Sequence, residues 1–178
     1  MLRDVEVLQQ ISKNNRLFVN ITITTLKADL ARILEPRAPR PDLRLEAMQK
    51  LNQEGIAAGV ICAPVLPGIT DSPRDLEGLV KATAKAGGKY IFANSLFLKP
   101  CSAAVFLPFL EKEFPHLIES YRQRYKDRAF LSASYRKRLS QLMKRLREKH
   151  GIPSNYDRYS QRTHPVADVP SDEQMKLF

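Results

Sequence analysis

The chain has 178 residues, of which 43% are hydrophobic and 27% charged, proportions that suit one globular domain. Its formal net charge is +10. No apolar run reaches the length of a membrane-spanning helix, and residues 1–15 hold no signal-peptide core, so a cytoplasmic location is expected. The two cysteines, Cys62 and Cys101, lie 39 positions apart, which disfavours a structural zinc site or a disulfide framework.

Three short apolar segments are predicted to form β-strands, at residues 17–23, 56–65 and 90–93. The first is rich in β-branched residues, and the second is almost wholly apolar, as strands buried on both faces are. Amphipathic helices, recognised by apolar residues at helical spacing, surround these strands. They are predicted over residues 3–14, 26–34, 41–55, 73–87, 101–112, 114–125 and 131–149.

Local signals predict where several helices begin and end. Thr25 is expected to cap the helix 26–34, and Asp71 or Ser72 the helix that begins at Pro73. Gly55 suits the end of the helix before the second strand. Residues 151–178 are polar and have no periodicity, so they are predicted to form a disordered tail.

Strand–helix–strand connections of this length form parallel sheets with right-handed crossovers. Residues 1–94 are therefore predicted to form an α/β unit with about three parallel strands, followed by C-terminal helices. Three parallel strands are too few to stand alone, because both faces and both edges of such a sheet need cover. A segment upstream, or a partner chain, is therefore expected to complete the sheet.

Polar side chains gather where these strands end. Thr22 and Thr24 have the same parity on the first strand, and Pro67-Gly68 turns the chain just beyond the second. Ligands of β/α folds bind at the carboxyl ends of parallel strands. Arg44, near the start of a following helix, suits two-pronged binding of a carboxylate. Each also has a purely structural interpretation, the threonines as strand formers and Arg44 as a solvated helix residue.

Four strings in this order are informative together: Ile-Thr-Ile-Thr-Thr at 21–25, Glu-Pro-Arg-Ala-Pro at 35–39, Arg-Leu-Glu-Ala at 44–47, and Gly-Val-Ile-Cys-Ala-Pro-Val-Leu-Pro-Gly at 59–68. In this combination the chain resembles the C-terminal half of radical S-adenosylmethionine (SAM) proteins of the spore photoproduct lyase-like group, often labelled DNA repair photolyases. The resemblance covers about residues 2–115. No single string is specific alone.

The resemblance implies a partial (β/α) barrel of TIM type over residues 1–115, a basic helical extension over 116–150 and the tail. In this family SAM is reductively cleaved at a [4Fe–4S] cluster, and the resulting adenosyl radical abstracts a hydrogen atom from substrate. By resemblance, polar contacts to the methionine part of SAM would come from Thr22 and Thr24, and Arg44 would bind its carboxylate. The adenine would lie beside Val60, Ala63 and Pro64. Asn94 would lie near the adenine or the substrate, although it also suits a plain turn.

The chain departs from the family at the cluster. The family's Cys-x3-Cys-x2-Cys loop, which supplies three thiolates and leaves one iron open to SAM, is absent here. The chain alone is therefore expected to be inactive as a radical SAM enzyme. A truncated gene, a misplaced start codon or a separate N-terminal half that carries the cluster would each explain this departure.

A basic segment suggests a different class of function. Residues 120–149 contain eleven Lys or Arg and two acidic residues, a net charge of +9. A non-enzymatic nucleic-acid-binding module would use such a segment to neutralise phosphates, with Tyr121, Tyr125 and Tyr135 stacking on bases or packing. The phosphate contacts would come from Arg136, Lys137, Arg138, Lys144 and Arg145. The alternatives are a solvated helix pair that closes the barrel end, or an inactive product of a broken gene.

Overall fold

The computed structural model of the chain describes residues 2–153. The predicted tail, residues 151–178, therefore lies outside the described residues except for its first three positions. Among the described helices, none is long and apolar enough to cross a membrane.

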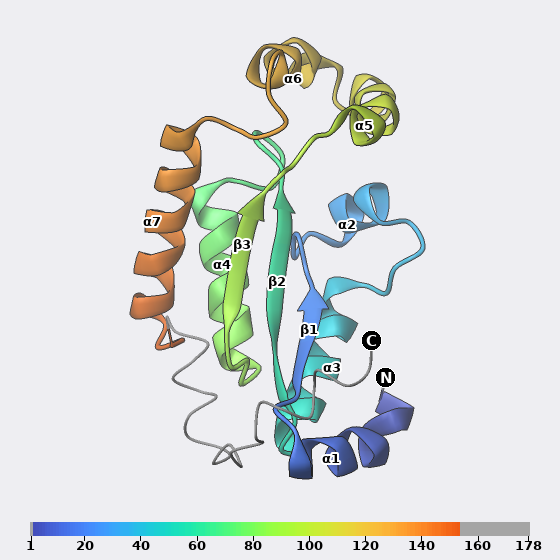
Figure 1. Cartoon of the computed structure of the whole chain (residues 1–178), viewed down its shortest axis with the longest axis vertical. Coiled ribbons are helices and arrows are strands. Elements are labelled where there is room, and N and C mark those ends of the chain that lie inside the picture. The colour runs from blue at the N-terminus through green and yellow to red at the C-terminus, as the bar shows by residue number, and fades with distance from the viewer. Residues whose placement is uncertain (1, 154–178) are drawn as a thin grey trace, which may run out of the picture.

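One parallel sheet forms the centre of the molecule (Figure 1). Its strands are β1 (Phe18–Thr22), β2 (Ala57–Val65) and β3 (Ile91–Ser95), in the order β1-β2-β3. Both pairs of neighbouring strands are parallel. The α/β class and the three parallel strands predicted from the sequence are confirmed.

The helices follow the predicted periodicity closely. They are η1 (Leu2–Asp4), α1 (Val5–Asn14), α2 (Ala28–Leu34), α3 (Pro41–Gln53), α4 (Pro73–Lys85), α5 (Pro100–Glu113), η2 (Pro115–Leu117), α6 (Ile118–Tyr125) and α7 (Ala133–Lys149). Ser72 caps α4 as expected, because its hydroxyl accepts a hydrogen bond from the Asp75 N–H at 3.1 Å.

The predicted cap at Thr25 is wrong. Helix α2 begins three residues later, at Ala28, with Lys27 in the capping position. The Thr25 hydroxyl instead accepts a hydrogen bond from the Lys27 N–H at 3.2 Å and so stabilises the turn that leads into the helix. Gly55, after α3, has the positive φ of 78° expected of a residue that ends a helix.

One face of the sheet carries the main hydrophobic core. This core contains Val19 and Ile21 of β1, Val60 of β2 and Ile91 of β3, because every second side chain of a strand points to the same face. Apolar residues of α3, α4 and α7 pack in the same core, and Figure 1 shows α3 and α4 on the far side of the sheet. The predicted basic extension, 116–150, therefore shares a core with the sheet through α7.

Among the described residues, the opposite face of the sheet carries exposed polar side chains. Asn20 and Thr22 of β1 and Asn94 of β3 are exposed on it. At its lower end the Tyr90 ring lies over Gly59, where a Cβ atom would come within 2.5 Å of the ring. The Tyr90 hydroxyl bonds the Val19 carbonyl at 3.0 Å and the Asn20 side chain at 2.9 Å. Glycine at position 59 is thus required by close packing of an aromatic ring on the strand.

Helix α7 lies along the β3 edge of the sheet (Figure 1). The Arg147 guanidinium donates a hydrogen bond to the Ile91 carbonyl at 3.3 Å, and Met143 and Leu146 enter the core. At the end of α7, Lys149 bonds the Glu77 carboxylate of α4 at 2.6 Å. One edge of the sheet is thus protected by a helix, whereas β1 forms the other edge.

The segments after β3 build a second, smaller core at the carboxyl ends of the strands. It contains Leu66, Leu96, Leu98, Leu110 and Tyr121. Figure 1 shows α5 and α6 at this end of the sheet, where they form a cap over the strand ends.

Candidate functional site at the strand ends

A largely apolar pocket of about 480 Å³ lies between the strand ends and the cap. Its volume falls in the ordinary range of small-molecule sites. The residues that line it come from all three strand ends and from α2 and α5: Thr24, Leu34, Glu35, Pro64, Leu66, Leu96, Ser102, Val105, Phe106 and Phe109. The pocket therefore occupies the position at which β/α folds bind ligands.

Thr24 is the most informative residue of this strand-end pocket. Its side chain is only 7% exposed, and its hydroxyl has no hydrogen-bond partner. A buried hydroxyl without a partner is unfavourable by about 1–3 kcal/mol, so such a group usually bonds water, an ion or a ligand or serves a functional role. The hydroxyl is therefore available to a ligand in the pocket.

The buried Arg44 and the half-buried Glu35 form an ion pair at the side of the pocket. The Arg44 guanidinium binds the Glu35 carboxylate at 2.9 Å, the Thr22 carbonyl at 2.7 Å and the Pro39 carbonyl at 2.7 Å. Arg44 is 9% exposed, whereas Glu35 lines the pocket. Arg44 thus ties the β1 edge to the loop before α3, and it already has a carboxylate partner within the chain.

Pro64 lines the pocket from an irregular part of β2. The register between β2 and β3 shifts between Cys62 and Val65, as in a β-bulge. Proline lacks the N–H that a regular central strand would use, so it fits such an irregularity. The bulge at the strand end places Pro64 on the pocket wall.

The structure divides the predicted SAM-binding residues into separate groups. Thr24 and Pro64 meet in the pocket. Thr22 and Asn94 are exposed on the open face of the sheet, and Ala63 is half-buried. Val60 is fully buried in the main core on the opposite face, so its side chain contacts helices. Thr22 and Thr24 differ in exposure, because Thr22 is exposed on the sheet whereas Thr24 is buried in the pocket under the cap.

The cysteines are not arranged to hold an iron–sulfur cluster. Burial raises the pKa of the Cys62 thiol to about 12, so it stays protonated at neutral pH. Cys101 is exposed at the start of α5. Within the described residues, no group of three or more His, Cys, Asp or Glu side chains could hold a metal ion.

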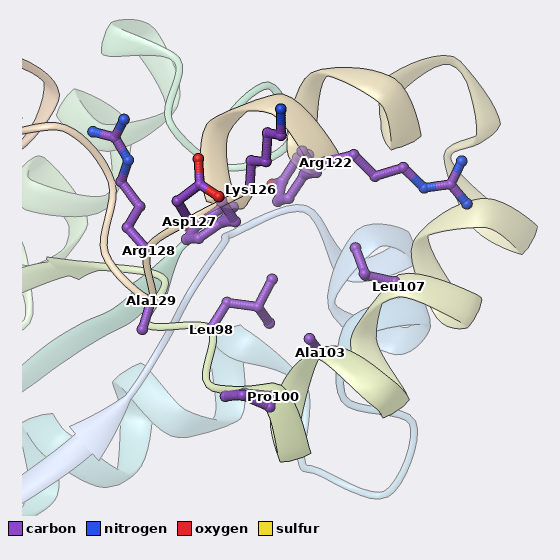
Figure 2. Close-up of a pocket in the computed structure, with 11 residues that line it drawn as sticks. Leu98, Pro100, Ala103, Leu107, Arg122, Lys126, Asp127, Arg128 and Ala129 are labelled. Atoms are coloured by element: carbon purple, nitrogen blue, oxygen red, sulfur yellow. The ribbon is translucent and has the colours of Figure 1, made fainter.

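The basic segment lies on the cap and on α7. A pocket of about 510 Å³ in the cap is lined by Leu98, Pro100, Ala103, Leu107, Tyr121, Arg122, Tyr125, Lys126, Asp127, Arg128 and Ala129 (Figure 2). Figure 2 shows the side chains of Arg122, Lys126 and Arg128 extending away from one another at its rim. Divergent cations of this kind do not form a cradle for a single anion.

The three tyrosines of the basic segment are structural. Tyr121 is buried and donates to the Pro67 carbonyl at 2.9 Å, and Tyr125 donates to the Leu96 carbonyl at 2.9 Å. The Tyr135 hydroxyl donates to the Asp71 carboxylate at 2.8 Å and is half-buried. Their hydroxyl groups therefore stabilise the cap and the junction of α7 with α4.

The predicted phosphate contacts are spread along α7. Arg138 and Arg145 line a groove of about 410 Å³ beside Asp71, and Lys144 is paired with Glu148 at 4.0 Å. Lys137 is exposed. Arg136 lies 5.7 Å from the centre of the Phe130 ring, in a cation–π contact. Sequence reasoning missed Phe130 and its partner Phe97, because nothing in the sequence indicates that residues 33 positions apart would pair.

The comparisons with known proteins name no activity. Over 154 residues the chain is 27% identical to an uncharacterized protein of Mycobacterium tuberculosis, which covers 86% of this chain and 45% of the relative. An uncharacterized protein of Acidianus two-tailed virus is 34% identical over 97 residues, or 53% of this chain and 32% of the relative. An uncharacterized protein of Methanocaldococcus jannaschii is 26% identical over 68% of this chain and 42% of the relative.

The chain thus spans less than half the length of these curated relatives. No family model matches the sequence, and no solved structure matches it.

Proposed function

We propose that this chain is part of a radical SAM enzyme of the spore photoproduct lyase-like group, and that the strand-end pocket holds the adenosyl part of SAM. The observation that carries the proposal is the unpartnered Thr24 hydroxyl, buried in an apolar pocket at the ends of three parallel strands. Bound SAM would supply the adenosyl group that is the source of a hydrogen-abstracting radical in this family.

The lining of the pocket fits an adenosyl group. Phe106 and Phe109 of α5 offer aromatic surface to a purine ring, and Pro64 and Leu66 offer further apolar contacts. The Thr24 hydroxyl would bond a polar atom of the ligand. Arg44, which is held by Glu35 and two carbonyls, would fix the shape of the pocket wall.

The chain's own residues do not fit a [4Fe–4S] cluster. Three thiolates are needed, whereas the chain has two cysteines, of which Cys62 is a buried neutral thiol. The cluster would therefore come from a further segment of a longer polypeptide or from a partner subunit. The greater length of the curated relatives is consistent with such a segment.

The outer edge of β1 is where this segment would join. Within the described residues β1 pairs on one side alone, with β2, so its other edge can accept a further strand. Arg44 bonds the Thr22 carbonyl at the end of this edge. The added strand would extend the sheet toward a barrel.

Binding of isotope-labelled SAM by equilibrium dialysis tests the proposal. Thr24→Val keeps the shape of the side chain and removes the hydroxyl, so the SAM dissociation constant should rise about five- to tenfold. Thr83→Val is the matched control, because its buried hydroxyl bonds the Leu79 carbonyl within α4 at 2.8 Å. Unchanged SAM binding by Thr24→Val would contradict the placement of the ligand.

A further inference from the structure

Two aromatic rings stack on each other at the surface of the cap. Phe97 follows β3, Phe130 precedes α7, and their ring centres lie 4.3 Å apart at an angle of 28°. Both are exposed, Phe97 by 39% and Phe130 by 51%. Exposed large aromatic side chains in contact with each other are typical of interaction surfaces.

A short backbone pairing positions the two rings. Phe97 and Phe130 form an isolated antiparallel β-bridge, and the Leu98 N–H donates to the Ala129 carbonyl at 2.8 Å. Because side chains alternate along extended backbone, Leu98 and Ala129 point the opposite way, into the cap pocket of Figure 2. The two rings are thus displayed outward by a fixed backbone, which lowers the entropy lost on binding.

A cation lies over each ring. The Lys99 ammonium is 5.4 Å from the Phe97 centre, and the Arg136 guanidinium is 5.7 Å from the Phe130 centre. Since one face of each ring contacts the other ring, each cation lies toward the remaining face. Long, exposed cationic side chains of this kind can move aside, so that a planar ligand takes their place on the ring face.

The surroundings of the pair are strongly basic. Residues 122–138 contain seven Lys or Arg and one acid, a net charge of +6. Within the described residues, Arg128, Arg136 and Lys137 have no acidic side chain at ion-pair distance. The charge complements a polyanion, and the aromatic pair complements the flat, apolar face of a nucleobase.

We propose that Phe97 and Phe130, flanked by Lys99 and Arg136, form a stacking platform for single-stranded nucleic acid. A base would stack on the outer face of Phe130 or Phe97, and the displaced cation would contact the neighbouring phosphate. The platform shares no residue with the strand-end pocket, so it stands whether or not that pocket binds SAM.

Fluorescence anisotropy with labelled strands of about 20 nucleotides tests the proposal. The full chain is titrated against oligo(dT), oligo(rU) and an abasic strand, which keeps the phosphates and lacks the bases, at about 50 mM salt. Wild type should bind the strands with bases more tightly than the abasic strand. If oligo(rU) binds more tightly than oligo(dT), the platform is assigned to RNA. The reverse order assigns it to DNA.

Variants separate stacking from charge. Phe130→Ala and Phe97→Ala should each weaken binding of the base-containing strands about tenfold and leave abasic binding unchanged. Phe130→Tyr, which keeps the ring, should bind as wild type does. Arg136→Gln should weaken all strands and lower the salt slope by about 0.7. Val7→Ala and Lys81→Gln, at exposed positions on α1 and α4, serve as matched controls without effect.

Two results would overturn the platform. One is equal affinity of the wild type for strands with and without bases. A preference for base-containing strands that is as large in Phe130→Ala as in the wild type would count equally against it. The other is no binding of any strand at about 50 mM salt, which would instead assign the aromatic pair to contact with another protein. Circular dichroism of each variant confirms that the comparison is made between folded chains.

Discussion

At the scale of single residues, alanine substitutions at Gly59 and Gly78 should change the stability of the chain in opposite directions. A Cβ atom at position 59 would lie 2.6 Å from the Tyr90 carbonyl, which is backbone and cannot move aside, whereas position 78 on α4 is open to within 4.0 Å. Gly59→Ala should lower the free energy of unfolding by about 1–3 kcal/mol, and Gly78→Ala should raise it by about 1 kcal/mol. Urea denaturation measures both, and a stable Gly59→Ala would contradict the close packing of Tyr90 on β2.

The two cysteines should differ in reactivity. Burial raises the pKa of Cys62 to about 12, so near pH 8 its thiol remains protonated and shielded, whereas Cys101 is exposed. A thiol-specific disulfide reagent should therefore modify one cysteine quickly in the folded chain and both after denaturation. Fast modification of both in the native state would show that β2 is more accessible than the structure indicates.

Thr24 and Phe130 show what the sequence could and could not predict at this scale. Thr24 follows an apolar strand, and its place near a ligand pocket follows from the rule that such sites lie at strand ends. Its burial could not be predicted, because the pocket around it is completed by residues of α5 that follow much later in the chain. The pairing of Phe130 with Phe97 depends on how the cap folds back on β3, which no local pattern encodes.

At the scale of elements, the link between α4 and α7 should depend on pH. Hydrogen bonds from Lys149 and then from His150 lower the pKa of the Glu77 carboxyl. A lowered folded-state pKa stabilises the folded chain above the ordinary pKa of about 4.5, and this contribution disappears as pH falls through the lowered value. The wild type should therefore lose more thermal stability than Glu77→Gln when the pH falls from neutral to acidic.

Melting temperatures across this pH range provide the measurement. Glu46→Gln is a suitable control, because Glu46 forms an exposed ion pair with Lys50 within α3 and links no two elements. Identical acid-side losses in wild type and Glu77→Gln would show that this contact does not hold α7 on α4.

Most element boundaries could be predicted because each helix has an apolar stripe with clear stops. Ser72 and Pro73 before α4, and Gly55 after α3, are local signals that the structure follows. The role of α7 as cover for the β3 edge could not be predicted, because it depends on Arg147 reaching the Ile91 carbonyl. Its predicted apolar stripe is nonetheless the face that enters the core, through Leu139, Met143 and Leu146.

At the scale of the whole molecule, the sheet is expected to be open at β1. The Ile23 N–H donates to the Ile61 carbonyl of β2. Because the backbone N–H groups of successive residues in a strand point to alternate sides, those of Asn20 and Thr22 point away from β2. Hydrogen exchange at Asn20 and Thr22 should be at least about tenfold faster than at Ile21 and Ile23. Equal protection of both sets would mean that another strand covers this edge.

The small sheet of three parallel strands was predictable from the sequence, whereas the partner expected at its edge stays a prediction. The segment proposed to extend the sheet would lie outside this chain, which spans less than half of its curated relatives. The residues that line the pocket come from three strand ends and two helices, so their convergence required the fold.

The most direct test of the central claim is a titration of the isotopically labelled chain with SAM, followed by the chemical shifts of backbone amides. The account predicts that the largest changes occur at Thr24, Leu66, Leu96 and Val105 around the strand-end pocket, and that they diminish in Thr24→Val. Absence of any change, or changes confined to Phe97 and Phe130 on the cap, would contradict it.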